Sequence, residues 1–446
     1  MGSLLIGELG NKALRFAAAA VLARTLSPAE FGDFNVAIAL SGILLIGTSL
    51  GLADTGARAV AVGAESPAVT SGRVVALRVT VLAPVAGLAF GMGAFVWPGH
   101  AGLLSAAIAM SFAMSLSGDW VARGLERMNA VGRASALGGA VALAGTVIVA
   151  LASASALWAL WAYVVAEGIV TLACWRSVRM TGRPRLTLIG AGALVRRTWP
   201  VGLSALAAYS YQANLDTVLI AAFRSSAEAG LYSAAYRIFL LLNVIATFAA
   251  YALLPRVSRE VAAGRLGGAA RLLGGAIPEL AAYGFVALGA IELAGEPLLA
   301  LLFGPRFVSM APTLTVLAVA VAWYAVGYPV GYGLMAGGRG RSFLAGAGTA
   351  GLLAFALDLL LIPPYGALGA AAATLIAFVV ATLIWLKLAS LLGRGLRMTL
   401  ATLTTASVLA LLTVFVPSTG TMAVVLTLLM AIFTVAAGRR GPFPRN

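Results

Sequence analysis

The stretch GELGNKALRFAAAAVLAR, residues 7–24, places four polar side chains inside an apolar run. They are Glu8, Asn11, Lys12 and Arg15. Their spacing of i, i+3, i+4 and i+7 puts them on one face of an α-helix, opposite a face of Ala, Leu and Val. A Lys or Arg at the centre of a membrane helix costs about 2.5–3.5 kcal/mol unless it faces protein, water or an anion. If this stretch is a membrane helix, Lys12 and Arg15 are therefore expected to face protein, water or an anion inside the protein.

The whole chain has the composition of a polytopic membrane protein. Of its 446 residues, 61% are hydrophobic and 10% are charged, and the mean hydropathy is +1.00. Apolar runs of about 18–25 residues match the length that crosses a hydrocarbon core. We expect an all-α protein with about fourteen transmembrane helices, approximately at 4–23, 33–53, 74–96, 101–120, 134–152, 156–175, 199–222, 230–253, 277–295, 312–335, 343–362, 367–387, 398–416 and 421–437.

The charges of the connections predict the topology. Alternate connections, including the one with Arg58, are rich in arginine, whereas the others, including the turn with Arg24 and Glu30, are short and nearly neutral. Because positive connections stay in the cytoplasm, we expect both termini there, in a multi-pass protein of the bacterial cytoplasmic (inner) membrane. The N-terminus has no basic region before its apolar stretch, so we expect it to remain as the first span.

Other functions are disfavoured by composition. The net charge of +15 follows from the cytoplasmic arginines, and we expect no nucleic-acid partner. Cys174 is the only cysteine and His100 the only histidine, so we expect no internal disulfide, no metal cluster and no histidine chemistry. No enzyme signature and no catalytic residue emerge, and the only cofactor we expect is a coupling ion, H⁺ or Na⁺.

An internal repeat predicts two lobes. AEFGDFNVA begins at Ala29 and AEAGLYSAA begins at Ala227, and they share the pattern A-E-x-G-x-aromatic-x-x-A. Each copy follows an odd-numbered span, which indicates a parallel duplication. We expect an N-lobe over 1–185 (spans 1–6) and a pseudo-symmetric C-lobe over 186–397 (spans 7–12). Residues 398–446 add two C-terminal helices and a cytoplasmic tail. In transporters that are built from parallel repeats, the substrate path runs between the two lobes. We expect the polar face of the first span to point toward this path.

Further polar residues lie within the predicted spans. Span 7 contains SYQANLDTVLI, with Gln212, Asn214 and Asp216, while Glu167 lies in span 6 and Arg237 in span 8. Intramembrane acids are candidates for proton or sodium sites, and we favour Glu167 and Asp216. A structural polar network is the alternative. It would pair Asp216 with Arg237, Glu8 with Lys12, and Arg15 with a carboxylate on a neighbouring helix.

Span 10 contains VGYPVGYGLMAGG, which combines Gly327, Pro329 and Gly331. A proline inside a helix frees a backbone carbonyl and permits a kink, so these residues are candidates for a hinge. Close helix packing through small residues is the alternative interpretation.

Several motifs together resemble bacterial oligosaccharide-lipid flippases, in the polysaccharide-transport branch of the multidrug/oligosaccharidyl-lipid/polysaccharide exporter superfamily. They are AEFGDFNVA, DTVLIAAF followed by GLYSAAYRI, LLFGPRF, and LLLIPPYGALGAAAATLIA. The resemblance implies lobes that open alternately to the cytoplasm and outside, moving undecaprenyl-pyrophosphate-linked oligosaccharide outward.

The same resemblance implies roles for individual residues. Lys12, Arg15 and Arg237 look like that family's luminal cations, Arg58 and Arg24 would contact the substrate at the gates, and Asp216 matches the family's acid in the seventh span. The partners implied are lipid-linked oligosaccharide, membrane lipids, and polysaccharide polymerase or ligase machinery. A lipid II flippase and a multidrug cation antiporter of the same superfamily are the alternatives, and the cations of span 1 argue against the antiporter.

Overall fold

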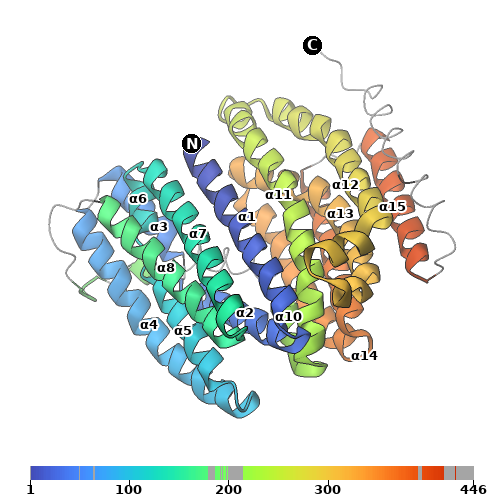
Figure 1. Ribbon diagram of the computed structural model, residues 1–446. Helices are drawn as coiled ribbons and strands as arrows, with labels where there is room; N and C mark the ends of the chain where they lie inside the picture. Colours follow the sequence, from blue (N-terminus) through green and yellow to red (C-terminus); the bar gives the residue numbers. More distant parts are fainter. Residues whose placement is uncertain are drawn as a thin grey trace. The chain divides into compact units, whose positions relative to one another are not determined.

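The computed structural model describes residues 2–49, 51–63, 66–178, 186–190, 192, 194–196, 198, 214–389, 394–415 and 427. Every regular element in these ranges is a helix (Figure 1). Nine of the described helices are long and apolar enough to cross a membrane. The chain is therefore a multi-pass, all-α membrane protein, as predicted. It forms two compact units, residues 1–221 with 225–230 and residues 222–224 with 231–446.

The first unit contains six long helices and several short ones. Its helices are α1 (Gly2–Thr25), α2 (Pro28–Ser49), α3 (Leu52–Val62), α4 (Pro67–Val96), α5 (Ala101–Ser115), α6 (Asp119–Gly124), α7 (Met128–Ala152), α8 (Ala156–Val178) and most of α10 (Leu215–Phe223). Cys174, the only cysteine of the chain, is buried in α8.

A capping box turns the chain between α1 and α2. The Ser27 hydroxyl accepts a hydrogen bond from the Glu30 backbone N–H at 3.2 Å, and the Glu30 carboxylate accepts one from the Ser27 N–H at 3.1 Å. Pro28 follows as the first residue of α2, where its missing N–H costs nothing. At the start of α11 (Ser226–Ala262), Ser225 accepts from the Glu228 N–H at 3.1 Å. The two copies of the sequence repeat thus begin their helices with the same cap.

The glycine that the two copies of the repeat share, Gly32 in the first and Gly230 in the second, makes equivalent contacts in both. A Cβ at Gly32 would overlap the Ser226 carbonyl oxygen, and a Cβ at Gly230 would overlap the Pro28 carbonyl oxygen. Residues 225–230 belong to the first unit, so this contact lies within it. The contact is reciprocal, because each glycine meets the residue four positions before the other. Backbone approach this close leaves no room for a side chain at either position.

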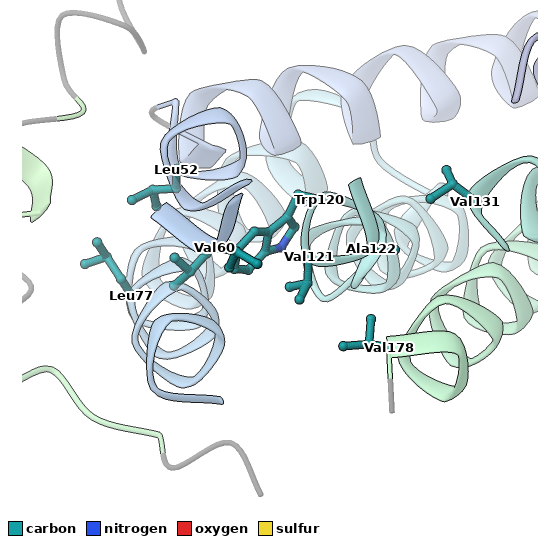
Figure 2. Close-up of a cluster of buried hydrophobic side chains, with 9 residues drawn as sticks. Leu52, Val60, Leu77, Trp120, Val121, Ala122, Val131 and Val178 are labelled. Atoms are coloured by element: carbon teal, nitrogen blue, oxygen red, sulfur yellow. The ribbon is translucent and has the colours of Figure 1, made fainter. Parts of the chain in front are cut away.

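The short helices α3 and α6 close one end of the first unit. Trp120 of α6 is 1% exposed and lies against Gly56 of α3, and Figure 2 shows it between the α3 side chain Val60 and its own neighbour Val121. Other members of this buried cluster come from α3, α4, α7 and α8, namely Leu52, Val74, Leu77, Val131 and Val178. The sequence predicts arginine-rich connections here, so these two helices are additions to the prediction.

The second unit is built around one buried helix. Its elements are the rest of α11, α12 (Leu266–Leu302), the 3₁₀ helix η1 (Pro305–Met310), α13 (Ala311–Ala336), α14 (Gly340–Leu388) and α15 (Arg394–Phe415). α13 is apolar on all sides and almost every residue from Thr313 to Leu334 is buried. A helix that is hydrophobic all round belongs in the core of a unit, with other helices covering it.

α14 contains two helices separated by a sharp break. Gly366 has φ 55° and ψ −132°, which only glycine adopts without strain, and it follows Pro363 and Pro364. The indole of Trp385 donates a hydrogen bond to the Phe343 carbonyl at 3.0 Å, so the far ends of the two helices meet. The predicted spans 343–362 and 367–387 therefore form an antiparallel hairpin.

Several other predicted spans correspond to helices whose ends differ from the predicted ones. α11 and α12 each have 37 residues and are much longer than the predicted 230–253 and 277–295. Within span 199–222, the described helix begins at Leu215. Span 421–437 lies outside the described residues except Thr427. The lobe boundaries at 185 and 397 stay predictions.

Candidate functional site

The polar face of α1 is positioned by close packing on α7. A Cβ at Gly7 would overlap the backbone of Gly132, and a Cβ at Gly139 would lie 2.9 Å from the Cα of Asn11. The paired positions rise together along both chains, so α1 and α7 run parallel (Figure 1). Glycines at a helix contact let backbones approach, and this brings short polar side chains of one helix within reach of the next.

Arg15 is the centre of a polar network in the first unit. Its Nη2 lies 2.5 Å from Oε1 of Glu167 on α8, and its Nε donates a hydrogen bond to Oδ1 of Asn11 at 2.9 Å. The guanidinium carbon also lies 5.2 Å from the ring centre of buried Tyr163. The side chains of Arg15 and Glu167 are only 20% and 14% exposed, so solvent screens this pair weakly. The cation is thus held by a carboxylate, an amide oxygen and an aromatic face.

Glu8 and Lys12 have different surroundings. Oε1 of Glu8 accepts a hydrogen bond from the Ser135 hydroxyl of α7 at 3.0 Å. Lys12 is exposed, and it forms no ion pair with Glu8 or with any other residue in the described ranges. Of the predicted network, the pairing of Arg15 with a neighbouring carboxylate is therefore present and the pairing of Glu8 with Lys12 is not. Lys12 is left as a cation on α1 without a protein counter-charge among the described residues.

The other predicted cations are dispersed. Arg24, at the end of α1, and Arg58, on α3, are both exposed. Arg237 is partly buried in α11, in the second unit. The hypothesis that these three join Lys12 and Arg15 in binding substrate stays a prediction.

The predicted polar residues of span 7 lie at a helix start. Asp216 is 6% exposed in the first turn of α10, and its Oδ1 accepts a hydrogen bond from the Thr217 N–H at 2.8 Å. A carboxylate here is favoured by the helix dipole. Asn214, just before α10, has a left-handed backbone with φ 52°, and its Oδ1 is buried without a hydrogen-bond partner in the structure. Gln212 lies outside the described residues. The role of Asp216 and Glu167 in ion coupling stays a prediction.

The predicted hinge in α13 is tightly packed. A Cβ at Gly327 would overlap the Thr382 hydroxyl, and one at Gly331 would lie 2.8 Å from the ring of Trp385. Thr382 also donates a hydrogen bond to the Trp323 carbonyl at 3.0 Å. These contacts support the packing interpretation for Gly327 and Gly331. The hinge at Pro329 stays a prediction.

Two polar contacts were not predicted. Arg78, expected near a connection, lies inside α4, is 4% exposed and donates a hydrogen bond from Nη1 to the Ser115 carbonyl at the end of α5 at 2.8 Å. The imidazole of His100 stacks on Trp97 with ring centres 4.4 Å apart, and its Nε2 lies 3.3 Å from Oδ2 of Asp33. Each contact joins residues of two different helices, so no pattern within one segment of the sequence indicates it.

Glu292 is a third residue outside the predicted site. It lies inside α12, and both of its carboxylate oxygens are buried without a hydrogen-bond partner in the structure. The predicted span 277–295 puts Glu292 close to a helix end. The helix continues to Leu302, which places Glu292 well inside an apolar helix.

Known structures share this fold. The lipid II flippase MurJ in an inward closed conformation matches with a TM-score of 0.73 and 11% identity, covering 98% of each chain. An inward-facing multidrug resistance MATE transporter of the MOP superfamily matches with a TM-score of 0.67 and 16% identity, over 88% of this chain and 96% of that one. A MOP superfamily transporter from Pyrococcus furiosus, with a binding pocket described as reversed in polarity, matches at 0.57 and 18%, over 90% and 94%.

At these identities the likeness establishes the fold alone. No curated protein matches the sequence. A family model described as polysaccharide biosynthesis protein matches residues 1–261, which is more than half of the chain and includes all the residues of the Arg15 network. The chain therefore belongs to the polysaccharide biosynthesis protein family, with the fold of the MOP superfamily transporters.

Proposed function

We propose that this transporter is a flippase that moves undecaprenyl-pyrophosphate-linked oligosaccharide from the inner to the outer leaflet of the cytoplasmic membrane. Its family and its fold support a flippase-type transporter in polysaccharide synthesis. The arginine-rich connections support a topology with both termini in the cytoplasm. The cargo would be handed to a polymerase or ligase on the outer side, and a gradient of H⁺ or Na⁺ would supply the energy.

The observation that carries this proposal is the contrast between Lys12 and Arg15. Arg15 is already compensated by Glu167, whereas Lys12 is exposed and without a counter-charge in the described ranges. An isolated cation in a membrane helix costs about 2.5–3.5 kcal/mol, so an anion that arrives with the substrate would be stabilised by it. A pyrophosphate supplies this anion, and a lysine ammonium binds phosphate as a point charge.

The test compares Lys12→Ala with Lys12→Arg in cells depleted of the wild-type protein. We expect Lys12→Ala to accumulate lipid-linked oligosaccharide in the cytoplasmic leaflet, and Lys12→Arg to export it because the charge is kept. A membrane-impermeant lectin on inverted and right-side-out vesicles measures the sidedness. Export by Lys12→Ala at the wild-type rate, with the protein present in normal amount, would exclude Lys12 as the substrate cation.

A lipid II flippase is the second candidate, because its cargo also carries a pyrophosphate on a polyprenyl lipid and the fold match to MurJ covers 98% of each chain. The depletion experiment separates the two, because the lipid that accumulates is extracted and its sugar identified. Accumulated lipid II, in place of an oligosaccharide repeat unit, would replace our proposal with this candidate.

A further inference from the structure

Glu292 lies on the buried face of α12, deep within the helix. Phe285, Leu288, Gly295 and Leu299 are buried and follow the helical spacing on either side of it. At 1.5 Å per residue, Glu292 is about 15 Å along the axis from Leu302, which is about half the thickness of a hydrocarbon core. A carboxyl group at this position is therefore remote from both ends of the helix.

The carboxyl group has no partner in the part of the second unit that the structure describes. Both oxygens are shielded from solvent, and neither accepts a hydrogen bond or meets a cation. Glu296, one turn further along α12, is exposed instead. The two glutamates thus offer a buried and an exposed carboxyl group on the same helix.

The elements packed on α12 supply few charged groups. α13 has no charged residue, and its titratable side chains are tyrosines. α11, joined to α12 by the hydrogen bond from the Tyr283 hydroxyl to the Leu242 carbonyl, carries Arg237 at a comparable depth, and η1 and α15 carry arginines near the helix ends. The titratable and charged groups that α11, η1 and α13 carry along the stretch packed on α12 are Tyr232, Tyr236, Arg237, Arg306, Tyr324, Tyr328 and Tyr332.

A carboxylate anion without a counter-charge is expensive in a medium of low dielectric constant, whereas the neutral acid is tolerated. A buried carboxyl group in these surroundings therefore holds a proton, and it releases the proton when water or a cation reaches it. Pro297 removes the N–H that would bond to the Leu293 carbonyl, so the α12 backbone is locally less constrained beside Glu292. Burial without a counter-charge therefore favours protonation of Glu292, and the missing backbone hydrogen bond at Pro297 lies where a change in α12 could alter that burial.

We propose that Glu292 is a proton-binding site of the second unit, which takes up one proton when α12 is sealed against its neighbours and releases it when that face becomes hydrated. The reaction is the reversible protonation of one carboxylate oxygen and needs no other reactant. The ligand is a proton, and the site is distinct from the network of Arg15 and Glu167. It does not depend on the identity of the cargo.

The test is infrared spectroscopy of the protein reconstituted in lipid vesicles, titrated from pH about 5 to about 10, the range over which perturbed carboxyl groups ionise. A protonated carboxyl group in apolar surroundings has a C=O band separate from the carboxylate bands. We expect wild type to show one such band at neutral pH that Glu292→Gln lacks and that Glu296→Gln keeps. The band should disappear reversibly as the pH is raised.

Two results would overturn the proposal. One is an unchanged protonated-carboxyl band in Glu292→Gln, which would mean that Glu292 is ionised. The other is a band that belongs to Glu292 but stays constant over the whole titration, which would mean a permanently neutral structural group. If Glu292→Gln does not fold, Glu292→Asp serves in its place, because an aspartic acid at this position shifts the band without removing it.

Discussion

Glu167 and Glu292 are both glutamates inside membrane helices, one in each unit, and their surroundings are opposite. Glu167 lies 2.5 Å from the guanidinium of Arg15, which also has Asn11 and Tyr163 around it. Glu292 has neither a cation nor a hydrogen-bond donor within reach of its buried oxygens in the described residues. The comparison teaches that an acid in a span does not define a coupling site, because its neighbours decide whether it stays charged.

The largest effect should follow loss of the cation from the paired site. Arg15→Leu leaves Glu167 without its counter-charge, and breaking a buried pair from one side costs about 3 kcal/mol of unfolding free energy. Thermal unfolding of the purified protein in detergent measures this loss. The double variant Arg15→Leu/Glu167→Leu should recover most of the stability, because replacing a buried pair by apolar groups is close to neutral.

The same double variant separates structure from function. Under the proposed function, it should fold and still export, because Lys12, the cation assigned to the substrate, is unchanged. A double variant as unstable as Arg15→Leu alone would show that the Arg15 side chain stabilises the protein mainly by packing on Tyr163, and the contrast with Glu292 would then lose its electrostatic basis.

The next effect is loss of the charge from the acid itself. Glu167→Gln keeps the size of the side chain but leaves the Arg15 cation without an anion, and we expect a loss of about 2 kcal/mol. The measurement is again thermal unfolding, with Glu296→Gln as the exposed control. If Glu167→Gln is as stable as wild type within experimental error, the ion pair between Arg15 and Glu167 makes no net contribution to stability.

A smaller effect should follow at the amide that supports Arg15. Asn11→Ala removes the acceptor for the Nε–H of Arg15, and the loss of one such hydrogen bond corresponds to about 1 kcal/mol. Lys12→Ala is the matched control on the next residue, because Lys12 makes no ion pair in the described ranges and its removal should change stability by less than about 0.5 kcal/mol. Equal losses in both variants would indicate a general weakening of α1.

The smallest effect on stability belongs to Glu292. If it is a neutral acid at pH 7, Glu292→Gln resembles it in shape and charge, and the unfolding free energy should change by less than about 0.5 kcal/mol. Unfolding at neutral pH gives the comparison with Glu167→Gln directly. A loss as large as that of Glu167→Gln would mean that Glu292 is an anion with a partner, and the two sites would then be alike.

The sequence predicted the features that depend on pattern within one segment. Helical spacing placed Glu8, Asn11 and Arg15 on one face, and each of them does contact a neighbouring side chain in the first unit. The repeat at Ala29 and Ala227 corresponds to matching caps and reciprocal glycine contacts. The lengths of the apolar runs predicted the membrane helices, because the thickness of the hydrocarbon core sets the length that a spanning helix needs.

What could not be predicted depends on contacts between segments or on helix ends. Periodicity does not state which helix packs on α1, so the sequence predicts a carboxylate partner for Arg15 on a neighbouring helix without identifying it. Arg256 and Arg271 lie outside the predicted spans 230–253 and 277–295, but α11 and α12 continue through them because a helix can extend beyond the apolar layer. The same error in helix ends concealed Glu292, and short helices such as α3 give too little periodic signal.

Cys174 makes the protein convenient for thiol chemistry. It is the only cysteine, and at 1% exposure it is shielded from maleimide reagents. The native sequence is therefore its own unlabelled background, and no cysteine has to be removed before new ones are introduced. Spin labels at exposed Val62 of the first unit and Leu266 of the second would then report the distance between the units directly, in each step of a transport cycle.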